Sequence, residues 1–472
     1  MIKEGREFMK KKFIVAMIAG LCGVTFLTAN PTEAAQAVSG HNQKVNVATP
    51  FEAKVLVDNL GSPWEMLWGA DNQIWITERE SKCISKIDPT RGVKKTLYTF
   101  DNAFAAFPHQ GVLGMALKDN YVYAAYTYEE SGNKYARIVR LTYDNKADVL
   151  KNETIILDKL PASADHNSGR VLIGNDNKIY YSIGDQGFNQ GEYVNKEIQS
   201  QKLPTAEQVN AKDFSNYPGK ILRINLDGSI PNDNPIIEGV RSHVYAYGFR
   251  NTQGMEFVGD KLFSTEHGPS TDDEINLIEA GGNYGWPYVA GYRDNESYVY
   301  ANYSKATKEL QAKFDPNLIP NGLPTQKETD FNAPNLKDPL KTFNTVRNGY
   351  NFYDEAYGQL AYIGWPTIAP SDLAYYPADG KIEMFRNSLL VTTLKSGAIY
   401  QLKLDSKAEQ VQGDAAKFFK TNNRYRAILI SPDTRKIYVA TDNIGNAMGT
   451  NGKPITNMEN KGAIIVFSYT EK

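Results

Sequence analysis

Residues 170–181 read RVLIGNDNKIYY. A run of aliphatic residues is followed by a Gly-Asn-Asp-Asn turn and then by a second run that contains Ile179, Tyr180 and Tyr181. Asn, Asp and Gly are favoured in tight turns, whereas β-branched and aromatic residues are favoured in strands. The stretch therefore predicts a β-hairpin.

The same order of residues recurs along the chain. Further copies are MLWGADNQIWI (66–76), LGMALKDNYVY (113–123), GMEFVGDKLF (254–263) and ILISPDTRKIYV (428–439), and we interpret NSLLVT (387–392) as a sixth copy with a shortened entry. A single hairpin is too small to bury its own apolar face, so repeated hairpins have to stack. The pattern predicts an all-β β-propeller with loop insertions. The alternative is a β-sandwich whose hairpins are alike by coincidence.

The widest gap between hairpins covers about residues 294–345 and is polar. The segment from Ser304 to Phe314 has a partly helical pattern. We interpret the gap as an inserted excursion of the propeller rather than as a second domain.

The first 37 residues have the pattern of a secretory signal peptide. Three lysines at 10–12 precede an apolar run from Phe13 to about Leu27, and residues 35–37 form an Ala-Gln-Ala cleavage site. The mature domain then covers residues 38–472 and is exported, either secreted or periplasmic. No later apolar run is long enough to span a membrane. Cys83 is the one cysteine left, so the mature chain is expected to form no internal disulfide.

The charge balance of the mature chain excludes some partners. Removing five basic and three acidic residues from totals of 52 and 54 leaves 47 basic and 51 acidic residues. A net charge of −4 argues against nucleic acid and against an anionic membrane surface as partner. The chain also lacks the paired Cys and His spacings of a structural zinc site.

One histidine has the setting of a catalytic base. His166 lies in the stretch ADHNSGR (164–170), and Asp185 lies on the next predicted loop, in GDQG (184–187). Histidine exchanges protons near neutral pH, and a carboxylate on its other ring nitrogen fixes its tautomer. The alternative is an ordinary hydrogen-bonded turn, because Asp, Asn, Ser and Gly all favour turns.

Cations recur where the predicted blades meet. They are Arg250, Lys395, Arg424 and Arg426. Four cations directed at one place require a polyanionic ligand, because unpaired buried charge is costly. The alternative is a set of ordinary surface cations. The stretch EHGPSTDDEIN (266–276) is rich in oxygen donors of the kind calcium prefers, although acidic runs are also common in solvated turns.

Several motifs together resemble those of the soluble quinoprotein glucose dehydrogenases. They are DHNSGR (165–170), GDQG (184–187), GFRN (248–251), EHGP (266–269), NYGWP (283–287), IGWP (363–366), LK (394–395) and NRYR (423–426). The resemblance covers about residues 50–470. It implies a six-bladed propeller that binds pyrroloquinoline quinone and calcium and oxidises the C1 hydroxyl of an aldose to the lactone. It also implies an external electron acceptor, and a homodimer in those relatives.

The resemblance assigns a role to each matched residue. His166 matches the base, Asp185 its supporting acid and Arg250 the arginine near the quinone carbonyls. The further cofactor contacts are Gln190, Asn251, Lys395, Arg424 and Arg426, and the substrate contacts are Asp165, Tyr362 and Trp365. Calcium at the quinone matches the carbonyls of Gly268 and Pro269, and further structural calcium ions match Glu274, Tyr284, Ala290, Tyr292, Asp294 and Glu328.

The chain departs from the family pattern at two places. His109 occupies a substrate-pocket position where the family has Gln, and Tyr357 and Gly364 stand where the family has a cysteine pair. Two other functions stay open at this point. One is a calcium-dependent hydrolase of the propeller class, such as a lactonase, and the other is a sugar-binding propeller without catalysis.

Overall fold

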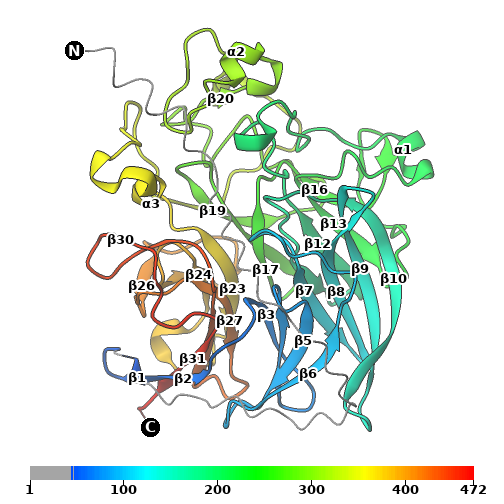
Figure 1. Cartoon of the computed structure of the whole chain (residues 1–472), viewed down its shortest axis with the longest axis vertical. Helices are drawn as coiled ribbons and strands as arrows, with labels where there is room; N and C mark the ends of the chain where they lie inside the picture. The colour runs from blue at the N-terminus through cyan, green and yellow to red at the C-terminus, as the bar shows by residue number, and fades with distance from the viewer. Residues whose placement is uncertain (1–43, 46, 472) are drawn as a thin grey trace, which may run out of the picture. The chain divides into compact units, whose positions relative to one another are not determined.

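A computed structural model describes residues 44–45 and 47–471 of the chain. The predicted signal peptide, residues 1–37, lies outside the described residues, so it stays a prediction. Within the described part, the strands form six sheets of four or five strands, and helices are few and short (Figure 1). No helix there is long and apolar enough to cross a membrane.

The first three sheets follow one another along the chain. The first contains β3 (Pro63–Trp68), β4 (Ile74–Glu78), β5 (Cys83–Ile87) and β6 (Lys94–Thr99). The second contains β7 (Val112–Lys118), β8 (Tyr121–Glu130), β9 (Asn133–Asp144) and β10 (Val149–Pro161). The third contains β11 (Val171–Ile173), β12 (Lys178–Ile183), β13 (Lys220–Asn225) and β16 (Val244–Tyr247).

The other three sheets repeat this antiparallel order. The fourth contains β17 (Thr252–Val258), β18 (Lys261–Glu266), β19 (Asp273–Ile278) and β22 (Lys341–Phe343). The fifth contains β23 (Pro370–Tyr376), β24 (Ser388–Thr393), β25 (Ile399–Lys403) and β26 (Ala416–Phe418). The sixth contains β27 (Tyr425–Ile430), β28 (Lys436–Thr441), β31 (Ile464–Tyr469), β2 (Phe51–Val57) and β1 (Lys44–Val45).

Short elements decorate the connecting loops. Three two-stranded pairs are β14–β15 (Ile236–Ile237, Val240–Arg241), β20–β21 (Tyr300–Ala301, Thr325–Gln326) and β29–β30 (Ala447–Met448, Pro454–Ile455). The α-helices are α1 (Ala206–Ala211), α2 (Lys308–Gln311) and α3 (Ala361–Gly364). The 3₁₀ turns are η2 (Gly191–Tyr193), η3 (Tyr303–Lys305), η4 (Glu328–Asp330), η5 (Glu355–Leu360) and η6 (Glu383–Phe385).

The six sheets form a closed ring. The first strand of each sheet packs against the first strands of the two neighbouring sheets, from β3 through β27 and back to β3. The described residues form six hydrophobic clusters, and each lies between two adjacent sheets. The cluster that includes Val57, Ile74 and Tyr438 joins the sixth sheet to the first. The predicted all-β, six-bladed propeller is confirmed, and the two-sheet sandwich is excluded.

The repeated turns explain the repeated sequence pattern. The N–H of Gly174 donates to the carbonyl of Lys178, and Asn177 takes φ 57°. The turn at residues 69–73 makes the same bonds, again with Asn at a positive φ. Asn tolerates this left-handed conformation better than most residues, because its short polar side chain bonds locally. This turn joins the first two strands of the sheets that contain it.

The structure corrects the boundaries of the sixth hairpin. Residues 387–392 are not a complete copy, because Ser388–Thr393 is the second strand, β24. Its first strand is β23 (Pro370–Tyr376), and the two pair antiparallel across a connection at residues 377–387 that contains η6. A long connection in place of a tight turn explains the misplaced boundary.

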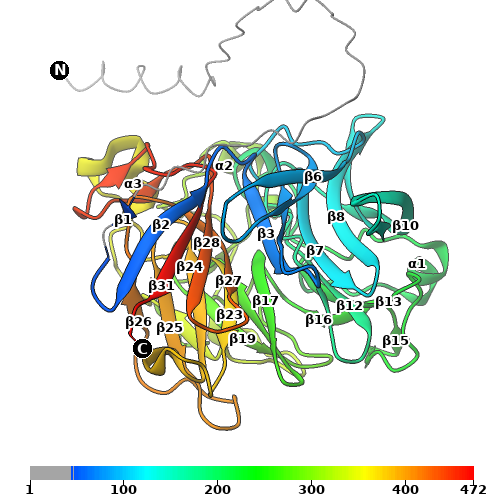
Figure 2. The ribbon, with the colours of Figure 1, turned by 90° about the horizontal axis from the view of Figure 1, so that it is seen from below.

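The predicted excursion, about residues 294–345, begins after β19, but its last part is wrong because it includes β22, a strand of the fourth sheet. Its helical part is shorter than the predicted Ser304–Phe314, because only η3 and α2 form there. The ring itself is closed by chain ends, since β2 from the beginning of the described chain pairs with β31 from its end (Figure 2).

Candidate active site

The predicted functional residues lie at one end of the six sheets. In an antiparallel hairpin, the start of the first strand and the end of the second lie at the same end. His166 and Arg250 precede the first strands β11 and β17, and Asp185 and Lys395 follow the second strands β12 and β24. Arg424 precedes β27 in the same way. The ring therefore brings together residues that are far apart in the sequence.

These residues line two cavities that meet. The inner cavity has a volume of about 360 Å³ and contains all four predicted cations, which are Arg250, Lys395, Arg424 and Arg426. The outer cavity has a volume of about 620 Å³ and includes Asp165 and Gln190. Both cavities are lined by His109, His166, Arg250, Pro269, Tyr362 and Trp365. His166 thus lies where an inner ligand and an outer ligand would touch.

His166 is held by a buried carboxylate. Its Nδ1 lies 2.7 Å from Oδ1 of Asp185, which is 1% exposed. The N–H of Gly187 also donates to Oδ1 at 2.8 Å, and the indole Nε1 of Trp286 donates to Oδ2 at 2.8 Å. With the proton of the neutral ring on Nδ1, the Nε2 lone pair is free to accept a proton. The pair is arranged as a general base with its orienting acid.

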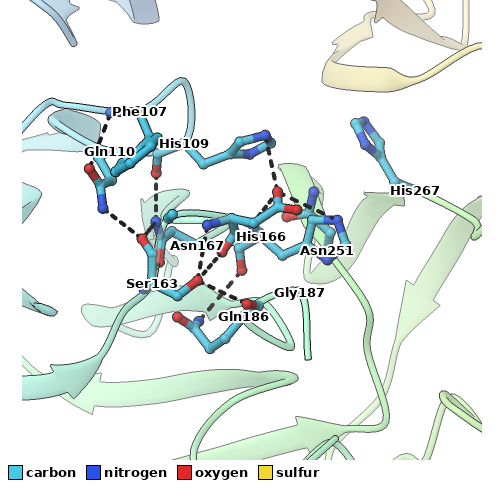
Figure 3. A network of polar contacts seen from close by, with 12 residues as sticks. Phe107, His109, Gln110, Ser163, His166, Asn167, Gln186, Gly187, Asn251 and His267 are labelled. Carbon is cyan, nitrogen blue, oxygen red and sulfur yellow. Dashed lines mark hydrogen bonds and ion pairs between the residues drawn. The ribbon is translucent and has the colours of Figure 1, made fainter. Parts of the chain in front are cut away.

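Side-chain bonds fix the loop that carries His166. The backbone of His166 has φ 42°, a conformation that costs a non-glycine residue about 1–3 kcal/mol. Ser163 Oγ donates to the carbonyls of Asp165 and Gln186, and Asn167 Nδ2 donates to the carbonyls of His109 and Ser163 (Figure 3). The loop is therefore tied to its neighbours on both sides, which stabilises the unusual conformation.

Asp165 lies between two imidazoles in the outer cavity. Its Oδ1 lies 3.2 Å from Nε2 of His109 and 3.7 Å from Nε2 of His166. Burial opposes ionisation of Asp165, but the two histidines and the His166 N–H outweigh it and lower its pKa below the usual range. Burial also lowers the pKa of His109 to about 4. His109 is therefore neutral near pH 7, and its ring lies against the carboxylate of Asp165 without forming an ion pair at that pH.

The cations of the inner cavity share few carboxylates. Asp442 pairs with Arg426 at 2.7 Å and lies 3.8 Å from Arg79. Burial raises the pKa of Asp442, but Arg426, Arg424 and Arg79 outweigh it and hold the pKa at about 2. Among the described residues, Lys395 Nζ donates only to oxygens of neutral groups, on Trp365, Thr367 and Tyr362. Desolvation lowers the pKa of Lys395 to about 8, although the charge of Asp273, which lines the same cavity, opposes the shift. The cavity therefore keeps an excess of positive charge.

Three buried donors at or next to the inner cavity lack partners. Nε of Arg250, Nδ2 of Asn251 and Nε of Arg424 have no hydrogen-bond partner among the described residues. Gly445 has φ 106°, and a Cβ there would approach the Arg424 guanidinium to within 2.7–3.0 Å. The excess charge and the free donors fit a planar ligand with several carboxylates.

Glu266 fixes the backbone beside Arg250. Its Oε1 accepts from the N–H groups of Arg250 and Asn251, and its Oε2 accepts from Thr252 Oγ1 at 2.6 Å. Burial raises the pKa of Glu266 to about 7.

Free carbonyls lie next to the inner cavity. No donor of the described residues bonds to the carbonyls of Gly268 or Pro269, and both residues line the inner cavity. They also line a small cavity of about 10 Å³ together with Glu274, Tyr284 and Ala290. The donor set of carbonyls and one buried carboxylate fits calcium, which takes oxygen ligands including carbonyls.

Of the remaining predicted calcium ligands, two glutamates are buried and two other residues are exposed. Burial raises the pKa of Glu274 to about 8 and of Glu328 to about 7, and Glu328 accepts from the N–H of Ala290 at 3.0 Å. Tyr292 and Asp294 are exposed, and the carbonyl of Tyr292 already accepts from the N–H of Asp294. No cluster of three or more His, Cys, Asp or Glu side chains in the described chain is arranged to hold a metal. These structural ion sites stay predictions.

Several residues of the site were not singled out from the sequence. Asp442 lines the inner cavity among the cations, and the buried Arg79 lies 3.8 Å from it. Trp286 donates to the Asp185 carboxylate, and its ring lies 5.5 Å from the Arg250 guanidinium. His267 lines the inner cavity, with Nε2 2.9 Å from the carbonyl of Pro370 (Figure 3). The sequence could have indicated Arg79, Asp442 and His267, because each directly follows the second strand of a repeated hairpin.

The comparison of sequences gives matches over nearly the whole chain. The sequence model of the Glucose / Sorbosone dehydrogenase family matches residues 60–338 and 346–449. Quinoprotein glucose dehydrogenase B of Acinetobacter calcoaceticus is 42% identical over 485 residues, covering 98% of this chain and 100% of that protein.

Solved structures support the same architecture. The PQQ-bound form of an aldose sugar dehydrogenase from Streptomyces coelicolor gives a TM-score of 0.58 at 22% identity and covers 90% of this chain and 99% of its own. The calcium structure of a Trichoderma reesei protein of Carbohydrate-Active Enzymes Family AA12 gives a TM-score of 0.54 at 13% identity, with 93% and 99% covered. At these identities the two structures support the fold alone.

Proposed function

The chain belongs to the Glucose / Sorbosone dehydrogenase family, and from that premise we propose that it is a quinoprotein sugar dehydrogenase that oxidises the C1 hydroxyl of an aldose to the lactone. The observation that carries this proposal is the His166–Asp185 pair at the junction of the two cavities. The outer cavity would take the sugar and the inner cavity pyrroloquinoline quinone, which supplies the two-electron oxidation when bound. The relative from Acinetobacter calcoaceticus has quinoprotein in its name, which supports this choice of cofactor.

His166 performs the proton step in this proposal. The C1 hydroxyl would give its proton to Nε2 of His166, and the C1 hydrogen with its electron pair would be taken up through the two-electron oxidation that the quinone supplies when bound, so that a carbonyl forms at C1. Asp185 stabilises the imidazolium that results, and it has no need to take the proton. Arg250 lines both cavities and places a positive charge where negative charge develops.

The cations and carbonyls of the inner cavity would hold the two cofactors. Lys395, Arg424 and Arg426 suit the carboxylates of the quinone. The free carbonyls of Gly268 and Pro269 suit a calcium ion, which supplies a Lewis acid there.

The two alternative functions have less support. A calcium-dependent propeller hydrolase needs carboxylate side chains as central metal ligands, whereas the donors next to the inner cavity are mainly carbonyls. A propeller that only bound sugar would have no use for a buried His–Asp pair beside four cations. We also propose that residues 1–37 direct export and that an external acceptor reoxidises the quinone.

A reconstitution experiment tests the proposal. The purified mature protein is mixed with quinone and calcium, and a panel of aldoses is assayed with an artificial electron acceptor. We expect activity that requires quinone, calcium and an aldose, and no activity with the matching methyl glycosides, whose C1 oxygen carries no proton. Hydrolysis of lactones without quinone would favour the alternative enzyme.

A further inference from the structure

A buried lysine lies beneath two loops of the active site. Lys220 is the first residue of β13, an inner strand of the third sheet, and its side chain is fully buried. It pairs with Ile183 at the end of β12 and with Tyr247 at the end of β16. Asp185 follows the first of these strands, and Arg250 follows the second. Lys220 is therefore adjacent to the bases of both loops.

The amino group of Lys220 is held by backbone carbonyls. Its Nζ donates to three of them, which belong to Gln199 at 2.6 Å, Ser200 at 3.1 Å and Pro218 at 2.9 Å. Desolvation lowers the pKa of Lys220 well below its usual range, and no charge among the described residues opposes that shift. A buried amine without a counter-ion is costly. Its three N–H groups match three carbonyls that an apolar side chain would leave unpaired.

The segment held by Lys220 supports the loop of Arg250. The carbonyl of Ser200 accepts from the N–H of Gly248 at 3.1 Å as well as from Lys220. Its Oγ donates to the carbonyl of Phe249 at 2.7 Å. Arg250 comes next in the chain, so Ser200 fixes the backbone from which the Arg250 side chain extends.

The next residue of the segment contacts Trp286. Nε2 of Gln201 donates at 2.9 Å to the carbonyl of Trp286, whose indole Nε1 donates to Asp185 at 2.8 Å. Two side-chain hydrogen bonds, of 2.8 and 2.9 Å, also join Gln201 to Asn283. Because Asp185 bonds the ring of His166, a displaced Gln201 would disturb the base through Trp286.

We propose that Lys220 is a positioning residue of the dehydrogenase reaction, which holds residues 199–201 so that Trp286 stays on the Asp185 carboxylate and the backbone before Arg250 stays fixed. The inference rests on the proposed function, because the reaction at His166 is what this positioning serves. Lys220 lines neither cavity of the site, so it acts only through the residues that it holds.

The first test needs neither quinone nor sugar. Exchange of the Trp286 indole N–H with solvent is measured by nuclear magnetic resonance, and its signal is identified by its absence in Trp286→Phe. We expect Lys220→Met to speed this exchange by about threefold to thirtyfold, because the indole leaves Asp185 more often. The indole N–H of Trp68 donates to the carbonyl of Ile430, far along the chain, and serves as the internal control whose exchange stays unchanged.

The second test follows kcat of the quinone- and calcium-loaded enzyme from pH 5 to 9. Lys220→Met should lower kcat by about threefold to thirtyfold and shift the pH profile in the same direction as Trp286→Phe. The double variant should lose less than the product of the two separate fold-changes, because both act through one contact. Tyr217→Phe removes a buried hydrogen bond to His243 beside the same sheet, and this control for lost stability leaves the pH profile unchanged.

A further variant covers the case in which Lys220→Met does not fold. Gln201→Met keeps the lysine and removes the bond to the Trp286 carbonyl, so it should speed the indole exchange by a smaller factor. Wild-type exchange in folded Lys220→Met, or in Gln201→Met where Lys220→Met does not fold, would overturn the positioning role, as would fold-changes in kcat that simply multiply in the double variant. Absence of sugar oxidation by the wild type would count against the proposed function alone, because the exchange measurement does not depend on it.

Discussion

Replacing Asp185 by Asn tests how much the orienting carboxylate contributes. The carboxylate accepts three hydrogen bonds in a site that is 1% exposed, from His166 Nδ1 and Gly187 N on one oxygen and from Trp286 Nε1 on the other. An amide has only one acceptor oxygen. In either orientation its NH₂ group faces a donor, so at least one bond is lost and the imidazolium loses its counter-charge. A hydrogen bond to a charged group is worth about 1.5–3 kcal/mol.

If that loss falls on the transition state, Asp185→Asn lowers kcat by about 10-fold to 150-fold. The assay is steady-state oxidation of an aldose by the reconstituted enzyme, with kcat followed from pH 5 to 9. Trp286→Phe keeps the carboxylate and removes one donor, so it should shift the pH profile with a smaller loss of kcat. A folded Asp185→Asn enzyme with wild-type kcat and pH profile would refute the role assigned to the pair.

Three further predictions concern the base, the cofactor and the metal. His166→Gln should lower kcat by about 10²–10⁴-fold while quinone affinity, measured by titration, stays within a few-fold of the wild type. Since desolvation lowers the pKa of Lys395 to about 8, below its ordinary 10.5, its charge is lost as the pH rises through 8 in the cofactor-free protein. Quinone affinity should therefore fall above pH 8 by up to about tenfold per unit, and titrations of Lys395→Gln should show no such fall. In the cofactor-free protein, the free energy of unfolding should rise between pH 8 and 10.5, because the folded state loses the buried charge of Lys395 before the unfolded state does. A calcium chelator should abolish activity and lower the melting temperature by several degrees in calorimetry, because bound calcium stabilises the folded state by mass action. An unchanged melting temperature would contradict the calcium sites. Magnesium should restore little activity.

The repeated hairpins were predictable from the sequence because their signals are local. An aliphatic run, a turn with Asn at a positive φ and an aromatic strand lie within about a dozen residues, as in the hairpin at 170–181. The outer strands lack such a signal, and the pairing of β2 with β31 depends on residues at opposite ends of the described chain. The first strand β23 was missed because a long connection separates it from β24.

Many residues of the candidate site could be predicted from the sequence, whereas most of the contacts between them could not. The pairing of His166 with Asp185 follows from motifs on successive loops, and the geometry agrees with it. The bond from Trp286 to Asp185 joins residues of different sheets, so no local pattern indicates it. The contact of His109 with Asp165 likewise depends on how the second and third sheets pack.

Because β2 and β31 together close the ring, the order in which the strands are synthesised limits when the ring can close. Each of the first five sheets comes from one continuous stretch, so all of its strands are present once that stretch has been made. The sixth needs β2 and β31 together, so the ring stays open until residue 469 has emerged. Arg426 lies in that last sheet, and Arg424 directly precedes it. The wall of cations is therefore finished only after β31 has been made, so cofactor loading has to follow the synthesis of that strand.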